Sequence, residues 1–235
     1  IAFPELCFTP FFPVIYTREF QHYFMNDDCD AITTVRHKAK ELEMTTVIGY
    51  AEKSEGRYYN TAIVINSNGD IAGKYRKVHI PAPLINDHMG NYEKIYFTPG
   101  DLGYPVIEAD HVRIGLQICY DRHFPEGYRA QALQDADIIF NITATSSFSS
   151  DWRSETWKLL LRARAFENGV FVVGVNKTGQ EYGKEYYGHS MIVSPLGAEV
   201  LAFADTTQED FLLSHKIDLS DRWEAYLRLP FKRDI

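Results

Sequence analysis

The chain has 235 residues, of which 45% are hydrophobic and 24% are charged, so it holds enough apolar side chains for one globular domain with a sizeable core. Its formal net charge of −8 argues against a nucleic-acid or anionic-membrane surface. No apolar stretch approaches the roughly 20 residues that a membrane-spanning helix requires. We therefore expect a single domain over residues 1–235 that acts on a small soluble molecule.

The predicted elements alternate between short β-rich runs and longer helical ones, with no linker or internal repeat between them. This alternation is typical of one α/β domain with mixed sheets. The expected strands cover residues 46–51, 61–66, 71–77, 112–118, 137–142, 170–176, 189–194, 199–203 and 211–217. The expected helices cover residues 31–43, 126–135 and 152–168, with a short one after Asp218.

Turn and cap residues support several of these boundaries. The pair Asn68-Gly69 between two apolar runs favours a tight hairpin, so part of the sheet should be antiparallel. Ser150 or Asp151 is a candidate N-cap for the helix 152–168, and Gly169 follows its end, where a left-handed residue is favoured. The run 137–142 is apolar on both faces and should lie between two layers.

The three cysteines, Cys7, Cys29 and Cys119, occur at unrelated spacings. Their odd number and the lack of paired CxxC motifs argue against a disulfide framework and against a metal site. A reducing compartment fits best, and we expect a cytoplasmic protein. The chain opens with Ile1 rather than Met, inside an apolar run, which indicates trimming or a piece of a longer protein.

Cys119 lies where a predicted strand runs directly into a helix that begins after Pro125. Such an elbow exposes a side chain at the sheet edge and lets backbone N–H groups face a developing oxyanion, the geometry that acyl transfer needs. This position suits a nucleophile. A small buried hydrophobic cysteine is the alternative, and the elbow alone does not decide between the two.

A reactive thiol needs a base and an electrostatic partner. No histidine is singled out by its surroundings, although His79, His123 and His189 are available. Other polar residues lie inside otherwise apolar, proline-bounded stretches, and these are Glu5, Lys77 and Glu93. Taken singly, each of them is as readily a surface charge, so the local sequence leaves the choice open.

Six stretches of the chain, taken in order, resolve this choice. They are FPELCFTPFFP around Glu5, GKYRKVHIP around Lys77, YEKIYFTPGDLGYPV around Glu93, ICYDRHFPEGYRA around Cys119, RARAFENGVFVVGVN and GHSMIVSPLG. In these stretches the sequence resembles the nitrilase superfamily, and more closely its N-carbamoyl amino acid amidohydrolase branch. The resemblance covers nearly the whole chain.

The resemblance implies an α/β fold of four layers, an α-β-β-α sandwich with mixed sheets, with no metal and no organic cofactor. It implies that Cys119 attacks the substrate carbonyl and that Glu5 is the general base. Lys77 and the backbone N–H of Tyr120 would stabilise the oxyanion, and Glu93 would position Lys77. The family also forms dimers and larger assemblies, so a homo-oligomer is expected.

The implied substrate is an N-carbamoyl-D-amino acid or a related N-carbamoyl or amide compound. It would be cleaved through a covalent thioester-type intermediate to the amine, ammonia and carbon dioxide. Arg122 matches an arginine that in such enzymes lies near the substrate carboxylate, although an ion pair with Asp121 or Glu126 is an equal alternative. His123 and Asn91 depart from the D-specific pattern, which weakens that specificity.

Other interpretations stay open. His79 follows Lys77 by two positions and would share its strand face, where it tunes the site or is a hydrogen-bonded core residue. A β-ureidopropionase or an N-carbamoylputrescine amidase fits as well. A nitrilase or aliphatic amidase is disfavoured by Tyr120-Asp121. A non-catalytic truncated member is the remaining alternative, because an N-terminal strand and helix and part of the C-terminal tail are expected to be absent.

Overall fold

The computed structural model describes residues 1–82, 91–147, 152–205 and 210–234. Its α-helices are α1 (Asp30–Glu41), α2 (Glu93–Tyr96), α3 (Pro125–Leu133), α4 (Trp152–Asn168) and α5 (Asp221–Arg228). Short 3₁₀ helices cover Phe12–Val14, Gln21–Tyr23, Cys119–His123 and Phe231–Arg233. The strands are β1 (Thr46–Ser54), β2 (Arg57–Ile65), β3 (Ile71–Arg76), β4 (Val106–Ala109), β5 (Val112–Ile118), β6 (Ile138–Thr143), β7 (Phe171–Asn176), β8 (Thr178–Glu181), β9 (Lys184–Tyr187), β10 (Met191–Val193) and β11 (Val200–Phe203).

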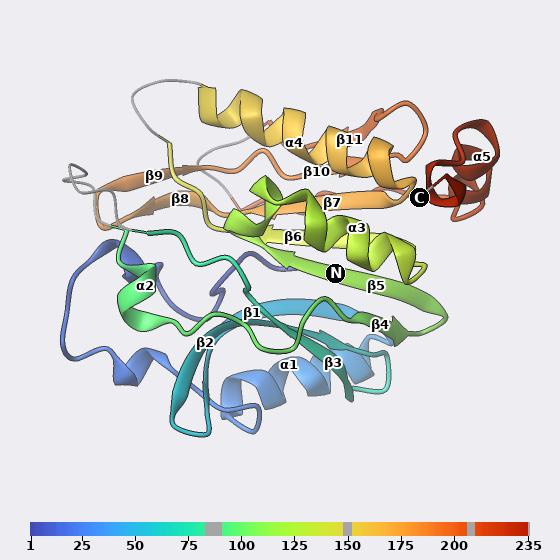
Figure 1. Cartoon of the computed structure of the whole chain (residues 1–235). Coiled ribbons are helices and arrows are strands. Elements are labelled where there is room, and N and C mark those ends of the chain that lie inside the picture. Colours follow the sequence, from blue (N-terminus) through green and yellow to red (C-terminus); the bar gives the residue numbers. More distant parts are fainter. Residues whose placement is uncertain (83–90, 148–151, 206–209, 235) are drawn as a thin grey trace.

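Two larger sheets face each other in Figure 1. One is an antiparallel sheet in the order β1-β2-β3, and the other has the order β11-β10-β7-β6-β5-β4. In the second sheet β5, β6 and β7 run parallel, whereas the outer pairs are antiparallel. The prediction of an α/β fold with mixed sheets is therefore confirmed. Strands β8 and β9 form a separate hairpin.

The inner faces of the two sheets meet in an apolar core. From the three-stranded sheet, Val47, Val64 and Tyr75 pack against Leu116 and Ile118 of β5. Each large side chain buried in this way contributes about 1.5–3 kcal/mol to folding. The same cluster includes Cys119 at the end of β5, so the core continues up to the predicted nucleophile.

Helices cover the two outer faces (Figure 1). Helix α1 lays Ile32 and Ala39 on the three-stranded sheet, where they meet Ile48 and Ile63. Helices α3 and α4 cover the six-stranded sheet through a cluster that includes Tyr128, Ala132, Trp157, Leu161, Ala165, Ile139, Val172, Met191 and Val193. The apolar faces of these helices therefore fix the outer layers.

The structure confirms one predicted turn and one predicted helix end. Strands β2 and β3 form the predicted antiparallel hairpin, and Gly69 in its turn has a φ of +82°, which favours glycine. Helix α4 ends before Gly169, whose φ of +60° places it in the left-handed region expected after a helix. The proposed N-cap residues Ser150 and Asp151 lie outside the described residues.

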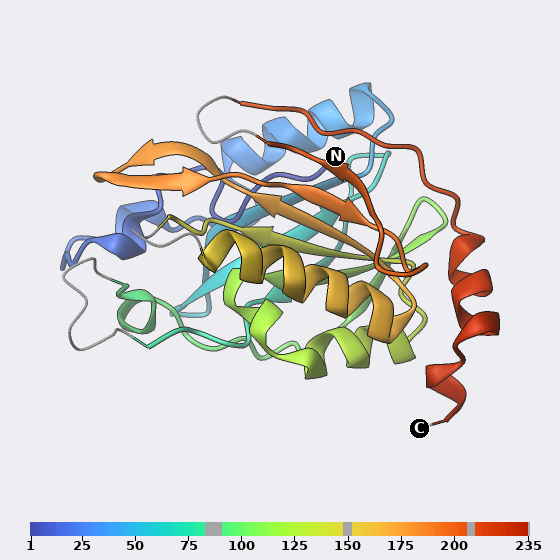
Figure 2. The same cartoon turned by 90° about the horizontal axis from the view of Figure 1, so that it is seen from above.

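One predicted element is wrong. Residues 211–217 form no strand, and Figure 2 shows them in the extended segment that leads along the outside of the molecule to α5. Phe211 and Leu212 are 61% and 72% exposed, because no neighbouring strand pairs with this apolar run. The short strands β4, β8 and β9 were not predicted. No helix in the described ranges is long and apolar enough to cross a membrane.

Candidate active site

Four separate segments bring the predicted catalytic side chains together. Glu5 lies in a turn of the N-terminal segment, Lys77 directly follows β3, Glu93 opens α2 and Cys119 directly follows β5. The N-terminal segment is held on β1 because Phe3 N donates to Val47 O at 2.9 Å. The two sheets and α2 thus deliver one residue each, and Glu5 comes from the segment bound to the sheet edge.

Lys77 is the centre of this cluster. Its side chain is fully buried, and its Nζ donates to Glu5 Oε1 at 2.8 Å and to Glu93 Oε2 at 2.5 Å. Burial opposes the charge of the ammonium, but the two carboxylates outweigh burial and raise the pKa of Lys77 well above its usual value. Lys77 therefore carries a permanent positive charge inside the protein.

Glu5 is fixed by further hydrogen bonds. Asn60 Nδ2 on β2 donates to Glu5 Oε1 at 2.7 Å, and the backbone N–H of Ala144 donates to Oε2 at 3.0 Å. Close packing also constrains the segment, because a Cβ at Gly49 would lie 3.2 Å from Glu5 Cα and 2.6 Å from Ile142 Cδ1. Both carboxylate oxygens therefore have a set orientation before substrate arrives.

Glu93 differs from Glu5 in its electrostatic surroundings. Burial raises the pKa of Glu93 to about 7, since desolvation and the negative charge of Glu5 outweigh the stabilising charge of Lys77. Its backbone N–H is bound by Asn91 Oδ1 at 3.3 Å. The carboxyl of Glu93 can therefore change its protonation state near neutral pH.

Cys119 has a φ of +47°, a conformation that costs a non-glycine residue energy and that recurs at functional sites. The predicted elbow is confirmed, since the 3₁₀ helix Cys119–His123 joins β5 to α3. Burial and the charge of Glu5 raise the pKa of the Cys119 thiol, while Lys77 and Arg122 lower it. The resting side chain is thus a thiol that needs a base. Thr145 Oγ1 lies 3.6 Å from Sγ.

Arg122 turns toward Cys119. Its Nη1 donates to the carbonyl oxygen of Cys119 at 2.8 Å and lies 3.6 Å from Sγ. The guanidinium also lies over the ring of Trp157, 5.5 Å from its centroid. Among the described side chains, no ion pair joins Arg122 to Asp121 or Glu126. The ion pair considered as the alternative for Arg122 is therefore not formed, and its observed partner is the backbone of Cys119.

The remaining candidates around the elbow occupy different positions. His79 Nδ1 lies 2.8 Å from Asp121 Oδ1, and its ring stacks on Phe124 with centroids 3.6 Å apart. It thus contacts the base of the elbow and not the carboxylates that bind Lys77. The ring of Tyr120 packs against Phe124, and His123 is exposed beside it. No contact with the catalytic cluster is observed for the His123 ring among the described contacts.

Some residues of the site were missed by sequence reasoning. Asn60, Asp121 and Asn176 are buried and hydrogen-bonded to site segments, and Asn176 Oδ1 accepts from the backbone N–H of Thr145 at 2.9 Å. A polar side chain within an apolar strand was the available signal for Asn60 and Asn176. In the described part of the chain, no cluster of His, Cys, Asp or Glu has the arrangement of a metal site.

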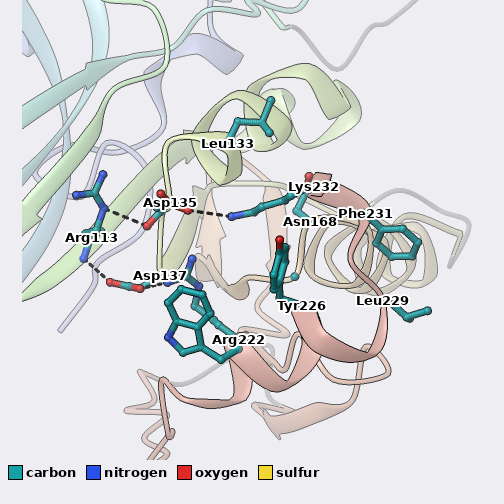
Figure 3. A pocket seen from close by; sticks show the side chains of 12 residues that line it. Arg113, Leu133, Asp135, Asp137, Asn168, Arg222, Tyr226, Leu229, Phe231 and Lys232 are labelled. Carbon is teal, nitrogen blue, oxygen red and sulfur yellow. Dashed lines mark hydrogen bonds and ion pairs between the residues drawn. The ribbon is translucent and has the colours of Figure 1, made fainter. Parts of the chain in front are cut away.

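A cavity of about 620 Å³ lies elsewhere, beside α5 (Figure 3). Arg113 and Asp137, which line it, are at the opposite end of the six-stranded sheet from Cys119. Arg113 and Cys119 are six positions apart along the extended chain of β5, a span of about 20 Å. The cavity is therefore distinct from the cluster around Lys77.

Comparisons of the whole chain with known proteins identify its family. The family model described as carbon-nitrogen hydrolase matches residues 1–226. The chain belongs to the carbon-nitrogen hydrolase family. This family is part of the nitrilase superfamily. The chain is 35% identical over 199 residues to the N-carbamoylputrescine amidase of Solanum tuberosum. The match covers 80% of this chain and 64% of the relative. It therefore spans less than two thirds of the length of the curated relatives that it matches first.

Solved structures support the same family fold. The crystal structure of a carbon-nitrogen hydrolase from Helicobacter pylori superposes with a TM-score of 0.90 at 31% identity, covering 100% of this chain and 82% of that chain. A mutant amidase from Nesterenkonia, with acrylamide added at its active-site cysteine, gives a TM-score of 0.76 at 25% identity. It covers 97% of this chain and 84% of that one.

Proposed function

We propose that this protein hydrolyses the carbon–nitrogen bond of a small N-carbamoyl or amide compound, with Cys119 as nucleophile. The observation that carries the proposal is the fully buried Lys77 ammonium, which is bound by Glu5 and Glu93. The charges of these three residues act on the pKa of the Cys119 thiol. Burying such a charge costs desolvation free energy. Buried charge clusters of this kind are typical of functional sites. An oriented general base, a cation and a thiol are the groups that thiol-dependent acyl transfer requires.

In the proposed first step, Glu5 accepts the thiol proton while Sγ of Cys119 attacks the carbonyl carbon. The proton passes to the leaving nitrogen, the carbon–nitrogen bond breaks, and ammonia departs. The substrate remains as a thioester-type, S-linked carbamoyl group. Glu5 then activates a water molecule that breaks the carbon–sulfur bond, and the released carbamate decomposes to the amine and carbon dioxide.

The oxyanion that forms in both steps would be stabilised by the Lys77 ammonium and by the backbone N–H of Tyr120. A single donor of this kind is worth about 3–4 kcal/mol in comparable sites. Glu93 would hold Lys77 in place together with Glu5, since both carboxylates accept a hydrogen bond from Nζ. No metal or organic cofactor takes part in this scheme.

N-carbamoylputrescine is the first substrate that we propose, because of the similarity to plant N-carbamoylputrescine amidases. An N-carbamoyl amino acid is the second candidate, and Arg122 favours it. Its guanidinium lies beside Sγ and is not neutralised by a carboxylate among the described contacts, so it can bind a substrate carboxylate. His79 and His123 remain proposed only as residues at the margin of this site.

The proposal is tested by ammonia release from N-carbamoylputrescine, N-carbamoyl-D- and L-amino acids, N-carbamoyl-β-alanine, simple amides and nitriles, with Cys119→Ala beside the parent. Turnover that the substitution abolishes supports the nucleophile and identifies the substrate class. Faster turnover of nitriles or simple amides would refute the carbamoyl assignment. A folded parent that turns over none of them would be a non-catalytic member.

We also propose that the layers in Figure 1 form the four-layer α-β-β-α sandwich of one domain, and that the protein self-associates. The two outer helical layers and the two facing sheets support the first statement. The second rests on the family resemblance. Light scattering coupled to size-exclusion chromatography measures the assembly directly, and a mass near 27.0 kDa would show a monomer.

A further inference from the structure

Asp121, two residues after the nucleophile, is a fully buried carboxylate. Its two oxygens make four hydrogen bonds. Oδ2 accepts from the hydroxyl of Tyr75 at 2.8 Å and from the backbone N–H of Ile118 at 3.0 Å. Oδ1 accepts from the backbone N–H of His79 at 3.0 Å and lies within hydrogen-bond distance of His79 Nδ1, at 2.8 Å.

The partners of Asp121 belong to two different sheets. Tyr75 in β3 and His79 lie two residues before and two residues after Lys77, on the chain that leaves the three-stranded sheet. Ile118 ends β5 of the six-stranded sheet and precedes Cys119. Asp121 thus joins the segment that carries the ammonium to the segment that carries the thiol.

The backbone at Cys119 makes such a link necessary. A φ of +47° is unfavourable for cysteine by about 1–3 kcal/mol, and a conformation of this kind persists only when its surroundings fix it. The bond from Ile118 N–H to the Asp121 side chain closes the turn around Cys119. The stack of His79 on Phe124 holds the other side of the same turn.

We propose that Asp121 is a positioning residue that fixes the separation between the Cys119 thiol and the Lys77 ammonium, with His79 and Tyr75 as its partners. It contacts neither the Lys77 ammonium nor the Cys119 sulfur among the described hydrogen bonds, so its effect on the reaction passes through these two residues. The link also has an electrostatic side. Alongside burial and Glu5, the charge of Asp121 contributes to the raised pKa of Glu93.

The turnover measurements rest on the proposed function, whereas the alkylation of Cys119 does not. In Asp121→Asn, one strong acceptor is lost while the shape of the side chain is kept. We expect kcat to fall about 100-fold, since small misplacements of reacting groups cost rates of this order, while KM stays within about threefold. Carboxamidomethylation of Cys119 by iodoacetamide should shift to higher pH, because Lys77 lowers the pKa of the thiol only when it is held near.

Asp137→Asn is the matched control. Asp137 is also a largely buried carboxylate that accepts a backbone N–H, from Arg113 at 2.8 Å, and it binds Arg222. It lies at the opposite end of β5. We expect this variant to keep the parental kcat and the parental alkylation profile even if its melting temperature falls, because its bonds do not reach the nucleophile.

Two further variants keep the test decisive if Asp121→Asn fails to fold. Tyr75→Phe and His79→Phe each remove one bond to Asp121 and retain an aromatic ring, and each should show a smaller loss in kcat and a shift of the same sign. An alkylation profile that is unchanged or moved to lower pH in the folded variants overturns the inference, as does an equal loss of kcat in Asp137→Asn. Should the parent hydrolyse no carbamoyl compound, the proposed function fails while alkylation still tests the link.

Discussion

The Nζ atom of Lys77 lies 2.8 Å from Oε1 of Glu5, although 72 positions of sequence separate the two residues. Both side chains are fully buried. The contact joins the N-terminal segment to the end of β3 and, through Glu93, to α2. A charge network of this kind stabilises the fold only while each charge keeps its partner.

Replacing Lys77 should therefore destabilise the protein strongly. In Lys77→Met the carboxylates of Glu5 and Glu93 lose their shared cation, and removing one member of a buried pair costs about 3–5 kcal/mol. Lys38→Met is the control, since Lys38 binds Glu41 in an exposed pair worth at most about 1 kcal/mol. Urea unfolding of the three proteins measures the difference, and equal losses in both variants would contradict the network.

Stability should depend on pH through Glu93. Burial raises its pKa from 4.5 to about 7, so the folded state binds more protons than the unfolded state between these values, and the parent loses stability as pH rises through this window. Glu93→Gln does not titrate. Its free energy of unfolding should rise relative to the parent by about 3 kcal/mol between pH 4.5 and 7. A difference that is independent of pH in urea unfolding would exclude this role.

Gly100 should tolerate no side chain. An added Cβ would clash with the carbonyl oxygen of Arg76 and lie 2.7 Å from its carbon, and Gly100 N–H donates to Lys77 O at 2.8 Å. Gly100→Ala should cost about 1–3 kcal/mol and lower activity by moving Lys77. Gly103→Ala is the control, because an added Cβ there meets open space and only the backbone φ of +65° disfavours it. This variant should leave activity unchanged. Thermal unfolding and ammonia release distinguish the two.

Arg122 should discriminate between the two candidate substrates. Arg122→Gln removes the charge near Sγ and should raise KM about 10-fold or more for N-carbamoyl amino acids, since a charge-assisted hydrogen bond is worth about 1.5–3 kcal/mol. N-carbamoylputrescine has no carboxylate and should show no such rise. The ratio of KM values for the two substrates is the measurement. An unchanged ratio would mean that Arg122 serves only the backbone of the elbow.

The part of the fold that local sequence determines could be predicted well. The Asn68-Gly69 turn, the C-cap at Gly169 and the elbow after β5 depend on neighbours in the chain, and all three are confirmed. The run 211–217 has strand-like composition but pairs with no neighbouring strand. Composition does not tell whether a sheet edge is free to pair with such a run. The hairpin of β8 and β9 was missed because its residues are mostly polar.

The site shows the same division. The elbow made Cys119 a candidate without deciding its role, whereas Glu5, Lys77 and Glu93 could be chosen only through the family resemblance. Their contacts span 72 and 16 positions, and no local pattern marks them among the other charged residues. Asp121 lies inside the motif around Cys119, yet its proposed role depends on contacts with β3 that are seen only in three dimensions.

The placement of Cys119 at the junction of two sheets has a consequence for the protein during its synthesis. A chain in which either sheet has formed alone carries a cysteine remote from Lys77 and Glu5, with the chemistry of any unactivated thiol. Under the proposed function, Glu5 can take the proton of this thiol only after the two sheets dock, so incompletely folded molecules lack the base-assisted nucleophile.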